Sequence, residues 1–239
     1  MEVCSVWLMQ WIEELENRDW IIEHSEELLA FYGEEPFWAD DPVPIKGDYR
    51  SLQSADPEAA AQAVVEGWLE ELGLPYQGAT VASMEEPGIY FDIEKDILHL
   101  DLNEQDLKSE YMPAVIALAV AALFISMKRP EEGQGWSQEE EMPIHTLVAI
   151  LLGFGPYICE AELRRKQQPE DTEQSEDSTT LAFDSGLSLE ECCFAQAYVS
   201  FIFEQDFTSY QNRFSPESRE LVAQALSYMM QMEQSQQEQ

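Results

Sequence analysis

Two apolar segments, residues 112–127 and 142–159, restrict the folds open to this chain more than any other feature. Neither segment contains Asp, Glu, Lys or Arg. A helix needs roughly 20 apolar residues to span a bilayer, whereas the first segment has only 16 residues and the second is interrupted by Gly153, Gly155 and Pro156. Basic residues flank the pair on both sides, so the positive-inside rule gives no preferred orientation. We therefore expect two buried core helices and no membrane span.

The rest of the chain is strongly acidic. Its 239 residues include 48 Asp and Glu against 12 Lys and Arg, which gives a formal net charge of −36. Because 45% of the residues are hydrophobic, the chain has enough apolar material to fold. A surface this negative repels phosphate backbones and anionic lipid headgroups, which argues against nucleic-acid and membrane-surface binding. The remaining interpretations are a solvated acidic coat, an acidic face for a basic protein partner, or salt adaptation, which the clustered Glu runs disfavour.

The cysteines and the N-terminus both indicate a reducing cytoplasm. Cys4, Cys159, Cys192 and Cys193 show no metal-type CxxC spacing. We expect all four to be small buried hydrophobes with free thiols. The apolar stretch at 3–11 is interrupted by polar residues and lacks the basic flank of a signal peptide.

The local patterns predict an α+β protein that is mostly helical, with a small antiparallel β-sheet or hairpin. Asp56, Pro57 and Gly73 give the clearest helix signals, as N-cap, first helical residue and stop. Ser188 with Glu191 forms a capping-box pattern at the start of another helix. Further helices are expected at 3–15, 19–33 and from 216, strands at 79–83, 88–93 and 96–102, and an irregular connection at 34–54.

The domain organisation follows from the same patterns. We expect an N-terminal helical segment at 1–33 and a single α+β domain at 34–239. The polar, acidic stretch at about 167–187 has no apolar period, which predicts a mobile surface loop. The Gln-rich tail at 232–239 is expected to fray.

The residues offer little catalytic chemistry. His24, His99 and His145 lie in separate segments, and none has a second His three or four positions away, as a zinc helix would. The chain has no GxSxG nucleophile motif and no phosphate-binding loop. We expect His99 to face solvent on a strand and His145 to lie in the first turn of a buried helix. A site assembled in space from His99, His145 and a carboxylate is the alternative.

The order of the segments GIYFDIEKDILHLDL, PAVIALAVAALFISM and HTLVAILLGFGPYI resembles a family of uncharacterised bacterial proteins with a zincin-like, HExxH metallopeptidase core. The resemblance spans roughly residues 36–228 and rests on pattern. In that family a helix with HExxH follows a strand pair, and a later helix carries an acidic ligand before a Leu-Gly-x-Gly segment.

The resemblance implies a degenerate member without the metal site. The HExxH positions fall near Ala119, Val120 and Leu123, and the third ligand falls near Thr146. Zinc hydrolysis needs imidazole ligands and a Glu that takes the proton from the bound water. We therefore predict a zincin-like core with no catalytic residues, no cofactor and no metal.

Three functional hypotheses remain. The first is a non-enzymatic, catalytically dead metallopeptidase-like scaffold that acts through protein–protein interaction, with a basic protein as partner. The second is an acidic inhibitor, immunity-type protein or nucleic-acid mimic that neutralises a basic partner. The third, ranked lowest, is a hydrolase with an unrecognised site around His99 or His145. A steep loss of binding with salt would favour a mimic, because charge contacts are screened and apolar contacts are not.

Overall fold

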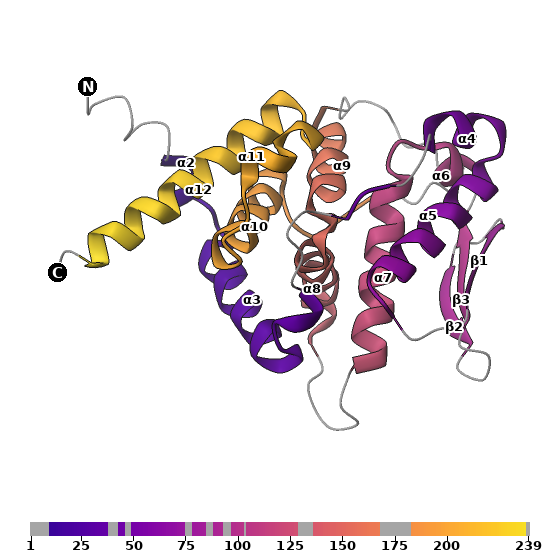
Figure 1. Cartoon of the computed structure of the whole chain (residues 1–239), viewed down its shortest axis with the longest axis horizontal. Helices are drawn as coiled ribbons and strands as arrows, with labels where there is room; N and C mark the ends of the chain where they lie inside the picture. Colours follow the sequence, from indigo (N-terminus) through magenta and orange to yellow (C-terminus); the bar gives the residue numbers. More distant parts are fainter. Residues whose placement is uncertain are drawn as a thin grey trace.

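The computed structural model describes residues 10–37, 43–45, 49–74, 78–84, 88–92, 97–102, 104–128, 136–167 and 183–237. Most of these residues are helical, and a small sheet lies at one end of the molecule (Figure 1). The helices are α2 (Gln10–Glu13), α3 (Arg18–Tyr32), α4 (Tyr49–Ala55), α5 (Pro57–Glu71), α6 (Glu104–Lys108), α7 (Met112–Lys128), α8 (Gln138–Ala149), α9 (Gly155–Gln167), α10 (Leu189–Ile202), α11 (Phe207–Tyr210) and α12 (Pro216–Gln237). The 3-10 turns η1 (Glu35–Phe37) and η3 (Gln211–Arg213), the π-helical turn η2 (Ile150–Phe154) and the strands β1 (Gly78–Ser83), β2 (Gly88–Asp92) and β3 (Ile97–Leu102) complete the described elements.

Helix α7 lies between the two halves of the molecule. On one side α5 separates it from the sheet, and on the other side it packs against α8 and α9 (Figure 1). Beyond these, α10 packs against α9, and both α3 and α12 pack against α10. Most α7 side chains are buried, including Ile116, Ala117 and Val120, which are 0% exposed. The expected core helix at 112–127 is therefore confirmed.

The second apolar segment is a helix with a kink. Helix α8 leads into η2, and α9 starts at Gly155. Gly153 has φ +91°, a conformation that costs little only for glycine. The kink leaves the Gly153 carbonyl free to accept the backbone N–H of Val43 at 3.0 Å. The break expected from the two glycines is thus present, and it anchors a distant segment.

Helix α8 begins earlier than the apolar pattern predicts. Ser137 and Glu140 form a capping box, and three acidic residues at 139–141 occupy the first turn, where the helix dipole favours negative charge. His145 was expected in the first turn of this helix, and that prediction is wrong because the acidic residues 139–141, which precede the apolar segment, are also helical. His145 lies two turns into α8.

The sheet is mixed, with strand order β1-β3-β2. The antiparallel pairing of β2 with β3 confirms the expected hairpin, with Tyr90 opposite His99. Strand β1 pairs with β3 in parallel, so a purely antiparallel sheet was the wrong prediction. An alternating pattern shows which face of a strand is buried, but it carries no information on the direction of the neighbouring strand.

Helix α5 has the ends that its sequence predicts. Asp56 accepts the backbone N–H of Ala59 at 3.1 Å, and Gly73 follows the helix with φ +60°. The preceding 34–54 connection was expected to be irregular, but its last part forms α4. That helix packs against α5, and the Gln53 amide donates to the Leu107 carbonyl at 3.0 Å. These tertiary contacts are invisible to a local pattern.

Helix α10 begins with the predicted capping box of Ser188 and Glu191. Residues 168–182 of the expected mobile loop lie outside the described residues, as do the first nine residues of the chain. The end of that expected loop is packed down, because Phe183, Ser185 and Leu187 are buried. Helix α12 continues to Gln237, so it extends through most of the tail that was expected to fray.

The close approach of α9 to α10 can be tested by substitution. A Cβ on Gly155 would lie 1.7 Å from Oε1 of Gln196, a buried side chain whose amide also donates to Ser200 Oγ at 3.0 Å. Gly155→Ala is therefore expected to lower the free energy of unfolding by about 1–3 kcal/mol. Gly67→Ala, in α5 with open space at Cβ, is the matched control and should stabilise by about 0.5–1 kcal/mol. Chemical denaturation measures both, and equal effects would contradict this packing.

Candidate functional site

The four positions that align with the metal site of the resembled family lie in the core. Ala119 and Val120 are 0% exposed and Leu123 is 3% exposed, all on α7. Thr146, on the adjoining helix α8, is 0% exposed. None of the four side chains is a thiol, an imidazole or a carboxylate, the groups that bind zinc in proteins.

Thr146 belongs to a buried polar cluster that sequence reasoning missed. Its hydroxyl donates to the Ser185 carbonyl at 2.7 Å, and the Ser185 hydroxyl donates to Glu162 Oε1 at 2.6 Å. Glu162 is 1% exposed and also accepts Nε of Arg165 at 2.7 Å. A buried carboxylate is tolerable only with such partners. The cluster joins α8, α9 and the segment before α10. Because Ser185 and Glu162 are buried, a substrate in solution cannot reach them.

The three histidines are not brought together. His99 lies on the central strand, where its Nδ1 is 2.6 Å from the Thr80 hydroxyl. His145 lies on α8, separated from the sheet by α5 and α7 (Figure 1). His24 stacks on Trp20 within α3, with ring centroids 4.3 Å apart. A joint site of His99 and His145 is therefore not formed.

Three cysteines are buried free thiols, as predicted. Cys159, Cys192 and Cys193 are 0% exposed. Burial raises the pKa of Cys159 and of Cys192 well above the ordinary value of a thiol. Both are therefore poor nucleophiles at neutral pH. Cys4 lies outside the described residues.

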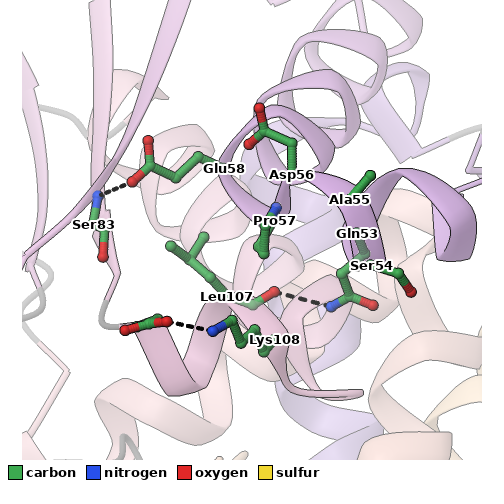
Figure 2. A pocket seen from close by; sticks show the side chains of 10 residues that line it. Gln53, Ser54, Ala55, Asp56, Pro57, Glu58, Ser83, Leu107 and Lys108 are labelled. Carbon is green, nitrogen blue, oxygen red and sulfur yellow. Dashed lines mark hydrogen bonds and ion pairs between the residues drawn. The ribbon is translucent and has the colours of Figure 1, made fainter.

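The described residues line two adjoining pockets, which share Gln53, Ser54 and Lys108. The larger one, of about 640 Å³, surrounds the start of α5 (Figure 2). Its carboxylates already make structural contacts. Figure 2 shows Glu58 accepting the backbone N–H of Ser83 at 3.1 Å and Lys108 paired with Glu104.

The second pocket, of about 520 Å³, lies where α4, the start of α7, α9 and η3 meet. We call it the basic pocket, because Arg50, Lys108, Arg164 and Arg213 line it. Only 12 of the chain's 239 residues are Lys or Arg, so fourteen residues taken at random would include fewer than one cation on average. Such a concentration of positive charge in so acidic a chain is the most distinctive chemical feature of the described residues.

Two tyrosines complete one wall of the basic pocket. The Tyr157 hydroxyl accepts the backbone N–H of Ile45 at 2.9 Å and donates to the Val43 carbonyl at 3.0 Å. The Tyr49 hydroxyl is buried and has no hydrogen-bond partner among the described residues. Burial raises the pKa of both phenols, so both are neutral donors and acceptors at physiological pH.

The acidic surface lies elsewhere, on α2, α3 and the first turn of α8. Residues 10–37 contain a single cation, Arg18, whose guanidinium pairs with Asp19 at 2.9 Å. Helices α3 and α8 contact each other, which joins the two acidic stretches. We call the exposed carboxylates of these two stretches the acidic surface. They are Glu13, Glu14, Glu16, Asp19, Glu23, Glu26, Glu27, Glu139 and Glu141.

The described part of the chain was also searched for metal-binding clusters and for helices that could span a membrane. Within it, no three His, Cys, Asp or Glu side chains are grouped so that they could hold a metal ion. One continuous helical stretch, Glu139–Gln167, is long and apolar enough to cross a membrane, with a mean hydropathy of 1.6 over its most apolar window. That window is 78% buried inside the protein, as in a core helix.

Comparison with known proteins does not assign the chain to a family. No protein-family model, no curated protein and no solved structure matches it. Its function must therefore be inferred from its own residues.

His145 provides a pH test of the core around α8. Burial lowers its pKa below the ordinary value of about 6.5, and Glu141 only partly opposes this. The unfolded chain therefore takes up a proton as the pH falls below about 6.5, while the folded chain resists it, so acid destabilises the fold through this residue. We expect wild type to lose stability relative to His145→Asn between pH 8 and pH 5. Urea denaturation across that range measures the free energy of unfolding of both proteins. A difference between them that does not change with pH would contradict the burial of His145.

Proposed function

We propose that this chain is a non-enzymatic acidic protein, a catalytically dead metallopeptidase-like scaffold of the cytoplasm that acts by binding a basic protein. The observation that carries the proposal is the acidic surface on α2, α3 and α8. It has nine exposed carboxylates, and residues 10–37 supply a single Lys or Arg, Arg18, which pairs with one of the nine, Asp19.

The physical argument is electrostatic complementarity. Like charges gathered on one face repel one another, and a basic partner removes that repulsion when it binds. Complementary potentials speed diffusional encounter and suppress wrong partners more than they raise final affinity. The partner expected here is therefore a protein with a basic face of similar extent.

The core supports the non-enzymatic part of the proposal. Ala119, Val120 and Leu123 occupy the positions at which the resembled family carries HExxH, and all three are buried. Thr146 lies at the position of the third ligand, and its hydroxyl donates a hydrogen bond to the Ser185 carbonyl. One zinc ion bound tightly per chain and lost on His145→Ala would contradict this part.

Charge-neutralising variants test the acidic surface. Glu13, Glu16 and Glu23 are exposed, and their joint replacement by Gln removes three negative charges from this face. The matched control replaces Glu66, Glu70 and Glu71 by Gln on α5, which lies across α7 from α3 (Figure 1). Affinity capture from host lysate, followed by titration of the captured partner, measures both.

We expect the first variant to bind at least several-fold more weakly than the control. Binding should also fall steeply from about 0.1 M to about 1 M salt, because the Debye length shrinks from about 10 Å to about 3 Å. A mimic that binds through the same carboxylates would respond in the same way, so the salt dependence tests the acidic surface and does not separate these two candidates. Equal affinity for both variants, or binding that does not respond to salt, would contradict the proposal.

The spacing of carboxylates along α3 favours one second candidate, an acidic inhibitor that mimics nucleic acid. Asp19, Glu23 and Glu27 recur every four residues, which places one charge per helical turn, about 6 Å apart. If the partner itself binds nucleic acid, duplex DNA should displace this chain competitively. If the partner stays bound to this chain at saturating DNA, the mimic is excluded and the scaffold proposal stands.

A further inference from the structure

The basic pocket carries more positive charge than its surroundings require. Four cations line it, against two carboxylates, Glu110 and Glu160. One of the four, Lys108, already pairs with Glu104, which does not line this pocket. The chain has four times as many acidic as basic residues, so neutralising partners were available in abundance. Grouping cations around one cavity costs mutual repulsion, and this cost is offset when an anion occupies the cavity.

The two carboxylates are already engaged. Glu110 forms an ion pair with Arg164, and Glu160 Oε1 accepts the backbone N–H of Ser215 at 2.8 Å. Arg50 is exposed and makes no ion pair with the described residues. The pocket therefore offers a guanidinium that no described carboxylate neutralises.

Tyr49 lines the pocket, and its hydroxyl lies beneath the surface of the wall. The buried Tyr49 hydroxyl lacks a partner among the described residues, although buried polar groups are nearly always hydrogen-bonded. The volume of about 520 Å³ lies within the range of small-molecule sites. Arginine forks match phosphate and carboxylate oxygens in a bidentate geometry.

We propose that the basic pocket binds a small organic anion, whose phosphate or carboxylate group is held by Arg50, Arg164 and Arg213. This site is separate from the acidic surface, so the proposal stands whether or not a basic protein binds there.

Isothermal titration calorimetry at constant ionic strength tests the proposal on the full chain. Phenyl phosphate, phthalate and benzyl alcohol are the probes, and they distinguish a phosphate ligand, a dicarboxylate ligand and a neutral aromatic. We expect saturable binding of at least one of the two anions with a Kd below about 1 mM, and none of the alcohol.

Substitutions locate the binding. Arg50→Gln and Arg213→Gln each remove one charge from the pocket, and each should weaken binding roughly tenfold. Lys166→Gln removes the same charge from an exposed position of α9 outside the pocket, and it should leave the affinity unchanged. Thermal unfolding of each variant checks that the fold is retained.

Chemical-shift mapping provides the second readout. Bound anion should shift the backbone amide resonances of Gln53, Ala114 and Ala161, which line the pocket from three different helices. The absence of saturable binding of both anions up to about 10 mM would overturn the proposal. Equal weakening by Arg50→Gln and Lys166→Gln would also overturn it, because a general effect of charge would then explain the binding.

Discussion

Helix α7, whose residues 112–127 carry no charge, is the constraint on which the rest of the structure depends. A helix that is apolar on every face must be covered on every face, since each exposed apolar area costs free energy in water. Helices α5, α8 and α9 provide this cover, and the rings of Tyr32 and Phe37 close over Phe124, with centroids 5.1 Å and 5.4 Å away. The sheet, the kinked α8–α9 pair and α3 are thereby held around one centre.

This arrangement also determines where charge can lie. The two apolar segments, 112–127 and 142–159, contain no charged residue, so charge lies around them. Nine exposed carboxylates form the acidic surface on α2, α3 and the first turn of α8, and four of the twelve cations line the basic pocket. The described residues include three buried carboxylates, those of Asp106, Glu162 and Glu191. Glu162 has the hydroxyl of Ser185 and the guanidinium of Arg165 as partners. The acidic surface and the basic pocket thus differ in chemistry, and we propose a basic protein as the partner of the first and a small anion as the ligand of the second.

The sequence predicts elements whose signals are local. The ends of α5, the capping box at Ser188, the apolar run of α7 and the break at Gly153 all follow from neighbouring residues. The parallel pairing of β1, the helix α4 and the Glu162 cluster depend on contacts between distant segments. The basic pocket is of the same kind, because its cations come from α4, α6, α9 and η3, and no stretch of the sequence contains more than a fragment of it.

Native-state hydrogen exchange of the α7 amides tests the central claim most directly. If α7 is the dry centre of the fold, its amides from 116 to 125 should exchange only through global unfolding, with an opening free energy equal to the unfolding free energy of the whole protein. The amides of the exposed end of α12, near residue 232, should exchange much faster. Exchange of the α7 amides by local opening, at rates like those of the α12 end, would contradict a sealed core.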